Sequence, residues 1–503
     1  MYRQKDNEFD VIIIGGGATG AGTARDCSLR GLKVLLIERN DIATGATGRN
    51  HGLLHSGARY AVTDTESAAE CIRENMILKR IARNCIEKTD GLFITLPEDD
   101  PAYQTKFVEA CRKAGIRAKE IDPKEAMAME PAVNPSLVGA VVVPDGAVDP
   151  FKLTAANMTD AKLHGAKVLT YSEVVEILKD GNNVKGVKIR NRRTGEVDSF
   201  YAPVTVNAGG IWGQGIAKMA GAAITMFPAK GSLLIFGHRV NNVVINRCRK
   251  PANADILVPG GTISLIGTTS DRVPIEEVDR IRVTPEEVKI LLQEGQKLAP
   301  ALADTRIIRA YCGVRPLVAD ESDPSGRNIS RGIVLLDHET RDGIGGFITI
   351  TGGKLMTYRL MAEWTTDLVC RKLNLRRSCQ TARRALPGSG EKAHAQASGK
   401  GGSLICECER VTLQKASDAI DTLQVTNMVD LRRRTRLGMG TCQGELCACR
   451  GAGLLARKKE NPSRAKEDLK NFMNERWKGI YPICWGDSLR ENEYTQWIYS
   501  HEI

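Results

Sequence analysis

The sequence predicts an α/β fold, an α+β domain inserted into it, and a small helical domain near the C-terminus. Residues 9–39 predict a strand, a glycine-rich turn, a helix and a second strand, and residues 346–364 repeat the first three of these elements. The stretch between them holds alternating, strand-like segments. A segment rich in Gly, Ser, Ala and Lys at 376–403 predicts a flexible linker, and closely spaced cysteines follow it.

Length and composition are those of a soluble multidomain protein. The 503 residues allow roughly two to four domains, and 42% hydrophobic and 26% charged residues are ordinary values. A net charge of +11 indicates anionic partners, but no nucleic-acid-binding motif accompanies it, so we expect no nucleic acid. The polar start of the chain and the lack of any long apolar run predict neither a signal peptide nor a membrane span. Fourteen cysteines then indicate a reducing cytosol, where clustered cysteines more often bind metal than form disulfides.

The N-terminal glycines predict a dinucleotide site in a Rossmann-like unit. The run "VIII" (11–14) is typical of a strand buried on both faces, and Gly15, Gly17 and Gly20 follow in the spacing G-x-G-x-x-G. They permit a tight turn, close approach to a pyrophosphate, and close packing of the helix on the strand. Glu38 ends the next strand, where it can accept hydrogen bonds from a ribose diol and would repel the 2′-phosphate of NADP.

Two further segments favour FAD over NAD. Residues 41–60 form a long loop of small and polar residues directly after the ribose-binding strand. Residues 346–364 repeat the strand–glycine–helix order far downstream. A flavin held in an extended form needs such a second contact, whereas a nicotinamide cofactor must bind and leave.

Motifs in these regions resemble those of the FAD-dependent glycerol-3-phosphate dehydrogenases, a branch of the D-amino-acid-oxidase-like flavoproteins. In chain order they are "HSGARY" (55–60), "VTVNAGGIWG" (204–213), "GVRPL" (313–317) and "TGGKLMTYR" (351–359). The resemblance covers roughly residues 8–372. The longer run "ATGATGRNHGLLHSGARYAVTD" and the C-terminal cysteines are similar to the anaerobic branch of that family.

The resemblance implies a domain plan. We expect an FAD-dependent oxidoreductase domain at 8–375, followed by a flexible linker at 376–403, a ferredoxin-like domain at 404–456, and a tail at 457–503 that contacts a partner or a membrane surface. The FAD-binding parts of the first domain are expected at about 8–80, 146–225 and 336–372, and its substrate-covering parts at about 81–145 and 226–335. One clear helix in the covering part begins after an N-cap at Thr284.

The resemblance also implies residues that contact FAD. They lie in the glycine turn, the loop after the second strand, the strand that returns to the flavin, and the second glycine segment. They are Gly15, Gly17, Gly20, Glu38, Arg39, Thr47, Gly209, Gly352, Gly353 and Lys354.

Four cationic residues indicate an anionic substrate. Arg59, Arg315, Arg331 and Lys354 lie in glycine-flanked or loop segments, and Arg binds phosphate bidentately. By resemblance, Arg59, Arg315 and Lys354 hold the phosphate of sn-glycerol 3-phosphate and orient its alcohol. Arg331 is a further candidate ligand, and Tyr60 lines the pocket.

The implied reaction oxidises sn-glycerol 3-phosphate to dihydroxyacetone phosphate by hydride transfer to FAD. His55 is a candidate for the base that removes the hydroxyl proton. Two alternatives stay open: His55 only contacts the flavin or braces its loop, or the positive charge lowers the pKa of the substrate alcohol and water accepts the proton.

The C-terminal cysteines predict a cluster. Cys406 and Cys408 form C-x-C, and Cys442 and Cys447 form C-x4-C after 33 residues that contain two short amphipathic helices. This spacing favours iron–sulfur, then zinc, then packing or redox thiols. The segment resembles the bacterioferritin-associated-ferredoxin type of [2Fe–2S] domain, which implies these four ligands and leaves Cys449 outside the set.

Two C-terminal features allow more than one interpretation. The basic run "LRRRTR" (431–436) predicts either a dock for an acidic partner or anionic lipid, or a solvated helix face. Trp477, Trp485 and Trp497 in the tail predict either a contact with another protein chain or a membrane, or packing over the cysteine domain.

The resemblance implies partners: a membrane-anchored iron–sulfur subunit that passes electrons to quinone, together with a second flavoprotein subunit. It places the chain peripherally on the cytoplasmic face of the inner membrane, in anaerobic respiration. Two alternative functions remain, an amino-acid or opine oxidoreductase of the same flavin fold and a non-catalytic electron-transfer module.

Overall fold

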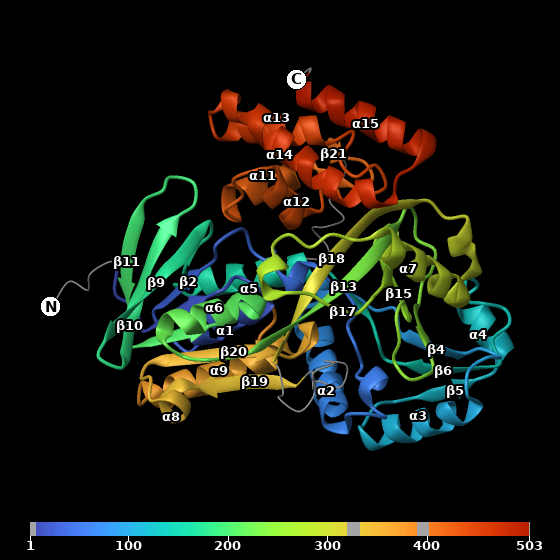
Figure 1. Cartoon of the computed structure of the whole chain (residues 1–503), viewed down its shortest axis with the longest axis horizontal. Helices are drawn as coiled ribbons and strands as arrows, with labels where there is room; N and C mark the ends of the chain where they lie inside the picture. The colour runs from blue at the N-terminus through green and yellow to red at the C-terminus, as the bar shows by residue number, and fades with distance from the viewer. Residues whose placement is uncertain (1–6, 319–331, 390–401, 502–503) are drawn as a thin grey trace.

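The computed structural model describes residues 7–318, 332–389 and 402–501. Its N-terminal body contains a six-stranded sheet in the order β19-β20-β12-β1-β2-β8 (Figure 1). The strands are β1 (Val11–Ile14), β2 (Val34–Ile37), β8 (Lys167–Leu169), β12 (Val204–Asn207), β19 (Ile333–Asp337) and β20 (Phe347–Gly352). The described neighbours pair in parallel, except for β19 with β20. The strand order reverses at β1, so the glycine turn after it opens where ligands of such sheets bind.

Both faces of this sheet are covered, as the run "VIII" predicts. Val11 and Ile13 of β1 pack in one core with the helices of one face, and Ile12 and Ile14 pack in another with a three-stranded sheet. The helices and strands around the sheet are α1 (Ala18–Leu29), α2 (Thr65–Ile81), α5 (Pro150–Leu163), α6 (Gly213–Ala220), α8 (His338–Asp342), α9 (Tyr358–Lys372), β9 (Ser172–Asp180), β10 (Asn183–Asn191) and β11 (Val197–Tyr201).

A second, larger sheet forms the other half of the body. Its strands come from two separate stretches of the chain, 91–143 and 226–318, which β4 and β14 join by parallel pairing. They are β4 (Gly91–Thr95), β5 (Lys119–Ile121), β6 (Gly139–Val143), β13 (Met226–Phe236), β14 (Val244–Arg247), β15 (Ile256–Gly260), β16 (Ile263–Gly267), β17 (Asp271–Arg272) and β18 (Ile307–Val318). Its helices are α3 (Pro101–Lys113), α4 (Pro123–Met129) and α7 (Pro285–Leu298). The short strands β3 (Ile86–Glu87) and β7 (Ala147–Val148) pair separately.

Helix α7 starts where the sequence predicts. The Thr284 hydroxyl accepts a hydrogen bond from the N–H of Glu287, and the Glu287 carboxylate accepts one from the N–H of Thr284. This reciprocal cap stabilises the first turn of the helix.

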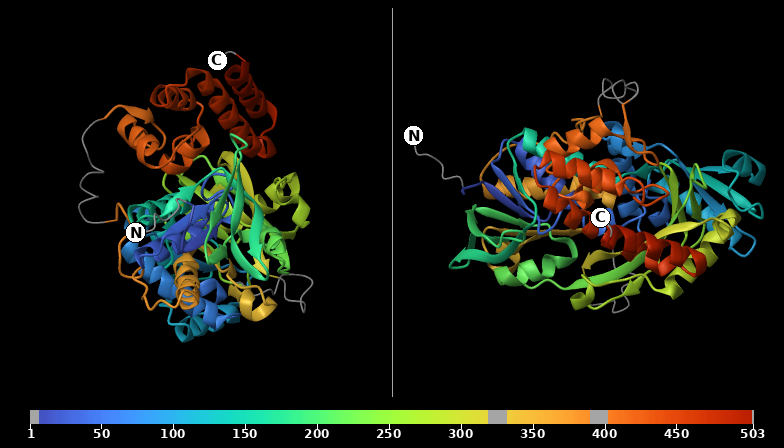
Figure 2. Two further views of the ribbon diagram at one scale, coloured as in Figure 1. Left: turned by 90° about the vertical axis from the view of Figure 1, so that its left-hand side faces the viewer. Right: turned by 90° about the horizontal axis from the view of Figure 1, so that it is seen from above.

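Residues 402–501, here called the C-terminal domain, lie across one side of the body (Figures 1 and 2). They form β21 (Leu404–Cys406), β22 (Val411–Thr412), α11 (Leu413–Thr422), α12 (Met428–Thr435), α13 (Ala448–Lys458), α14 (Pro462–Ile480) and α15 (Gly486–His501). Leu469, Phe472 and Met473 of α14 share one core with Cys406 and Cys447. The residues after 457 therefore pack over the cysteine segment. Trp485 and Trp497 nevertheless remain 67% and 50% exposed.

The C-terminal domain docks on the body through buried ion pairs. Arg434 and Arg433 both contact Asp41, at 2.5 and 3.0 Å, and Arg436 contacts Asp149 at 3.2 Å. Both interpretations of the basic run 431–436 are therefore wrong for these three arginines, because they bind acidic groups of the same chain. None of the described helices is long and apolar enough to span a bilayer.

Candidate functional site

A cavity of about 1390 Å³ opens at the carboxyl end of β1, and strand β18 forms part of its wall. Its walls come from the glycine turn, the loop after β2, the start of α6 and the second glycine segment. Sites for small ligands usually measure about 300–1,000 Å³. The larger volume suits an extended dinucleotide together with a substrate.

The glycine turn leaves room for a dinucleotide. Gly15 has a φ of +115°, and a Cβ there would lie 2.4 Å from the carbonyl oxygen of Ala208. Gly17 lines the cavity, and α1 begins at Ala18, so the helix N-terminus faces the cavity. A Cβ at Gly20 would lie 1.9 Å from the carbonyl oxygen of Gly15, so this glycine allows helix and turn to pack. Gly20 itself is outside the cavity wall.

Glu38 lies in the cavity wall, where the sequence places the ribose contact. Its carboxylate accepts hydrogen bonds from the N–H of Gly16 at 2.7 Å and from that of Asn40 at 2.8 Å. Burial raises the pKa of Glu38, and these two N–H groups oppose that effect. Each carboxylate oxygen has a second lone pair, so the group can also accept from a diol.

The remaining predicted FAD residues also line the cavity: Arg39, Thr47, Gly209, Gly352, Gly353 and Lys354. Arg39 pairs with Asp279 at 2.7 Å and stacks on the Trp212 ring at 4.3 Å. The Thr47 hydroxyl accepts a hydrogen bond from the N–H of Ala18 at 3.0 Å, which joins the loop to the start of α1. The donors, glycines and acid of this wall fit FAD.

Arg59 lines the cavity and is held in place by Asp255. Its Nη2 donates to Asp255 at 3.1 Å and to the carbonyl oxygen of Ala252 at 3.3 Å. Asp255 also holds Arg249 at 2.7 Å, and its side chain is 1% exposed. The buried Nη1 of Arg59 has no hydrogen-bond partner among the described residues. Arg59 therefore lies in the cavity wall in an orientation that Asp255 fixes.

Arg315 lies on β18, where the strand passes the cavity. Its guanidinium donates to the hydroxyl of Thr268 and to the carbonyl oxygen of Thr269 at 3.0 Å. A Cβ at Gly231 on the neighbouring strand would lie 2.6 Å from this guanidinium, so glycine makes room for it. Arg315 is thereby held in one orientation.

His55, Tyr60 and Lys354 lie side by side in the wall. The rings of His55 and Tyr60 are 5.5 Å apart, and the Lys354 ammonium lies 4.7 Å from the centre of the Tyr60 ring. The structure therefore brings together His55, Arg59, Tyr60, Arg315 and Lys354. Their roles stay predictions, and Arg331 lies outside the described residues.

Further cavity residues were not predicted from the sequence. Arg49 and Lys250 line the cavity and have exposed side chains, and Thr268 lines it beside Arg315. Arg49 stands in the run "ATGRNHG" and shares the glycine-flanked setting of Arg59, which could have indicated it. Lys250 and Thr268 carry no comparable sequence signal.

The four cysteines Cys406, Cys408, Cys442 and Cys447, here called the cysteine group, meet in the C-terminal domain. The sulfurs of Cys408 and Cys442 lie 3.7 Å apart. Two thiolates on one tetrahedral metal, with bonds of about 2.3 Å, would lie about 3.8 Å apart. A hydrogen bond from Cys447, aided by the N–H groups of Gly438 and Glu409, lowers the pKa of Cys406 to about 6.

The sulfurs of the cysteine group are arranged in pairs. Among the described residues, no three His, Cys, Asp or Glu side chains converge to hold a single metal ion. The sulfurs form two pairs, Cys408 with Cys442 and Cys406 with Cys447. Two pairs fit the two irons of a [2Fe–2S] cluster, whereas one zinc would draw four ligands to one point. Cys449 is in neither pair and contacts Tyr499 of α15.

Both loops of the cysteine group touch the body. Glu409, next to Cys408, accepts a hydrogen bond from Thr262 at 3.0 Å. The amide oxygen of Gln443, next to Cys442, lies 3.5 Å from Nη1 of Arg309. Arg309 is on β18, the strand that carries Arg315 into the cavity. Strand β18 thus contacts the loop of Cys442 and also forms part of the cavity wall.

Two family models match this chain. The model described as FAD dependent oxidoreductase matches residues 10–359, and the model described as BFD-like [2Fe-2S] binding domain matches residues 404–457. The two cofactors predicted from the sequence, FAD and a [2Fe–2S] cluster, are thereby confirmed.

Relatives match almost the whole chain. One subunit of the anaerobic glycerol-3-phosphate dehydrogenase of Escherichia coli (strain K12) is 64% identical over 99% of this chain and 97% of its own length. The corresponding protein of Haloferax volcanii, named for the same enzyme, is 40% identical over 97% of this chain and 90% of its own. Among solved structures, the glycerol-3-phosphate dehydrogenase from Bacillus halodurans complexed with FAD matches with a TM-score of 0.67. Its sequence is 21% identical, and the match covers 96% of this chain and 97% of that structure's chain. This likeness confirms the predicted fold.

Proposed function

The chain belongs to the FAD dependent oxidoreductase family, among the subunits of anaerobic glycerol-3-phosphate dehydrogenases, and from that membership we propose its reaction. It oxidises sn-glycerol 3-phosphate to dihydroxyacetone phosphate and passes the electrons through the [2Fe–2S] cluster towards the quinone pool in anaerobic respiration. FAD supplies the two-electron acceptor and the cluster supplies a one-electron centre.

The observation that carries this proposal is that Arg59, Arg315 and Lys354 line the same cavity as the residues predicted to bind FAD. Asp255 orients Arg59 by accepting a hydrogen bond from its Nη2. Arg315 and Lys354 add positive charge to the same cavity. A phosphate accepts several charge-assisted hydrogen bonds from such a set, each contributing about 1.5–3 kcal/mol.

The chain's own groups account for substrate binding and proton removal. Arg59, Arg315 and Lys354 hold the phosphate, which places the alcohol near His55 and Tyr60. His55 accepts the hydroxyl proton. Its main-chain carbonyl oxygen accepts a hydrogen bond from Asn75 at 3.1 Å, and the next residue, Ser56, donates its N–H to buried Asp145 at 2.6 Å. These contacts fix the backbone that carries the imidazole.

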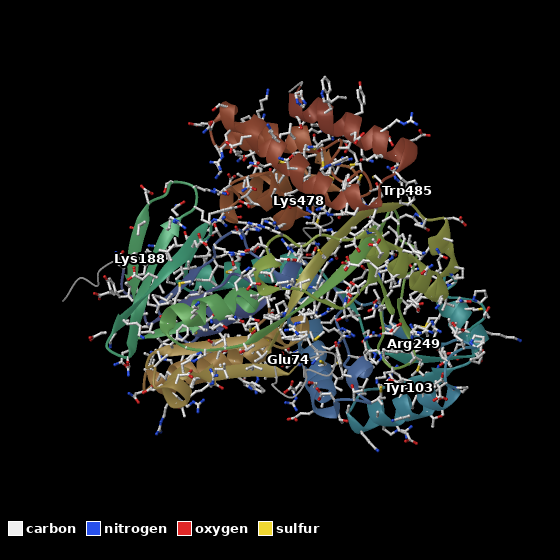
Figure 3. The ribbon with its side chains drawn as sticks, in the orientation of Figure 1. Glu74, Tyr103, Lys188, Arg249, Lys478 and Trp485 are labelled. Atoms are coloured by element: carbon white, nitrogen blue, oxygen red, sulfur yellow. The ribbon has the colours of Figure 1, made fainter. Side chains whose placement is uncertain are left out.

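The relatives are named as one subunit of a larger enzyme, which supports the proposal that this chain binds partner proteins. We propose that these partners are a membrane-anchored iron–sulfur subunit and a second flavoprotein subunit. The chain would then lie peripherally on the cytoplasmic face of the inner membrane. The net charge of +11 and the exposed aromatic side chains at the end of the chain support such contacts. Trp485, between α14 and α15, is labelled in Figure 3.

An anaerobic titration tests the proposal. Glycerol 3-phosphate is expected to bleach the flavin absorbance and then to produce the EPR signal of the reduced cluster. Replacing the cavity arginines, Arg59→Ala or Arg315→Ala, is expected to slow bleaching on the order of 10- to 100-fold, because charge-assisted hydrogen bonds of about 1.5–3 kcal/mol are lost.

The matched control is Arg249→Met, which removes the other arginine held by Asp255 but lies outside the cavity wall. Dithionite is expected to reduce flavin and cluster in every variant. Bleaching by an amino acid but not by glycerol 3-phosphate would favour the amino-acid oxidoreductase. If dithionite produces the cluster signal but neither glycerol 3-phosphate nor an amino acid bleaches the flavin, the result would favour the electron-transfer module.

A further inference from the structure

The loop after β2 has one side in the cavity and one side against the C-terminal domain. Residues 44–47 line the cavity. Asp41, Ile42 and Ala43 do not, and they are 1%, 4% and 1% exposed. The start of the FAD-binding loop is therefore packed between the cavity and α12.

Asp41 is the point of attachment. Arg434 approaches it with two nitrogens, at 2.5 and 3.0 Å, and Arg433 adds a third contact at 3.0 Å. The side chains of Asp41 and Arg434 are 2% and 3% exposed. Burial opposes ionisation of Asp41, but Arg434 and Arg433 outweigh it and lower the pKa of this carboxyl.

The attachment leads directly to the glycine turn. Two residues beyond Asp41, the N–H of Ala43 donates to the carbonyl oxygen of Gly16 at 3.0 Å. Three residues before Asp41, Glu38 holds the N–H of Gly16. Asp41 thus lies between two residues, Glu38 and Ala43, whose contacts with Gly16 help to hold the turn, beside the hydrogen bond from the N–H of Gly15 to the carbonyl oxygen of Ile37.

We propose that the C-terminal domain completes the FAD site: Arg433 and Arg434 position the FAD-binding loop through Asp41, so tight retention of FAD requires the docked domain. The domain has a second role beside carrying the cluster. The proposal depends on FAD as cofactor and not on the identity of the substrate.

The physical reason is that the pair is buried and bidentate. A bidentate Arg–carboxylate pair fixes orientation as well as distance. Removing one partner of a buried pair leaves the other charge uncompensated, which is strongly unfavourable. The loop then relaxes away from α12, and the cavity loses the geometry that FAD requires.

The test measures FAD binding in the full chain with its cluster. Asp41→Asn is expected to raise the dissociation constant of FAD at least about tenfold, measured by the quenching of flavin fluorescence. Flavin release on heating should also come well before the loss of helical circular dichroism. Arg434→Ala should have the same effect.

Asp149→Asn is the matched control. Asp149 forms the ion pair with Arg436 at the same interface but is no part of the FAD-binding loop. It also caps α5 by accepting from the N–H groups of Phe151 and Lys152, and Asn caps equally well. Its FAD dissociation constant should stay within about twofold of wild type.

A double-mutant cycle separates positioning from general destabilisation. If Asp41 acts through Arg434, then Asp41→Asn adds little in an Arg434→Ala background. The milder Asp41→Glu and Arg434→Lys keep the charges and should retain FAD better than the neutral variants, which keeps the test decisive if a neutral variant does not fold. Equal FAD affinity in wild type and Asp41→Asn, or equal losses in Asp41→Asn and Asp149→Asn, would overturn the proposal.

Discussion

The FAD cavity and the cysteine group are built in opposite ways. The cavity collects side chains from position 14 to position 358, on both sheets and several loops. The cysteine group collects its sulfurs from positions 406 to 447, within one small domain. The first site depends on how distant elements pack, whereas the second depends on two short loops.

The difference shows where each site is vulnerable. A local site fails when one of its ligands is lost. A site assembled over long distances fails when its supports move, even if every contact residue is intact. The interface between the two domains joins both kinds of site, because Asp41 belongs to the FAD-binding loop and Gln443 to a loop of the cysteine group.

The largest expected effect tests the local site. Cys447→Ser should abolish the EPR signal of the reduced cluster, because a buried sulfur of the Cys406–Cys447 pair is lost. Cys449→Ser, two positions away, should keep the signal, since Cys449 lies outside both pairs. The measurement is EPR after dithionite, together with iron content.

Flavin absorbance separates the two sites in the same samples. The Cys447→Ser chain should still be bleached by glycerol 3-phosphate. Loss of the signal in Cys449→Ser, or its survival in Cys447→Ser, would contradict the proposed ligand set.

A smaller effect is expected where the two sites meet. Arg309 donates to the carbonyl oxygen of Glu475 at 3.0 Å and approaches Gln443, so it ties β18 to the loop that carries Cys442. Arg309→Met should slow electron transfer from reduced flavin to the cluster on the order of tenfold, as expected for loss of a link worth about 1–2 kcal/mol. Stopped-flow absorbance resolves flavin bleaching by substrate, which should be unchanged, from the later reduction of the cluster.

Lys478→Met is the control for Arg309. Lys478 (Figure 3) also contacts Glu475, but its side chain is 68% exposed and does not reach β18. Its transfer rate should match wild type. If both variants slow electron transfer equally, α14 is perturbed as a whole, and Arg309 does not specifically couple β18 to the cysteine group.

Local patterns predicted much of both sites. The turn after β1, the cap of α7 and the two helices between the cysteine pairs all follow from spacing over a few residues. The four cysteines remain predicted ligands. Arg59, Arg315 and Lys354 were predicted because they stand in recognisable motifs, whereas Arg49 and Lys250 of the same cavity were not.

The contacts between distant elements could not be predicted in the same way. Asp41 and Arg434 are 393 positions apart, and Arg59 and Asp255 are 196 apart. The sequence pattern around a charged residue does not identify its ion-pair partner. The basic run 431–436 is equally compatible with contact to solvent, lipid or protein. Only the docked arrangement of the two domains shows that its arginines bind Asp41 and Asp149.

The smallest expected effect concerns the pH response of the C-terminal domain. Burial, with repulsion from Asp430 and Glu467, raises the pKa of Asp468 to about 6, and Arg464 at 3.7 Å compensates only partly. A carboxyl whose folded pKa is raised binds more protons in the folded state than in the unfolded one. Its unfavourable contribution therefore grows as the pH rises from about 4 to about 6 and is constant above that.

Asp468→Asn should remove this penalty and stabilise the domain on the order of 1 kcal/mol at pH 7, with a smaller gain at pH 5. The sign is opposite to that for Asp41, whose lowered pKa keeps its contribution present throughout this range. Calorimetric unfolding of the full chain at the two pH values measures the gain. Asp487→Asn serves as the control: its carboxyl is 93% exposed and its ion pair with Arg490 is on the surface, so the stability should change by less than about 0.5 kcal/mol. An equal gain at both pH values would show that Asp468 affects packing and not protonation, because only the charged carboxylate is disfavoured by burial.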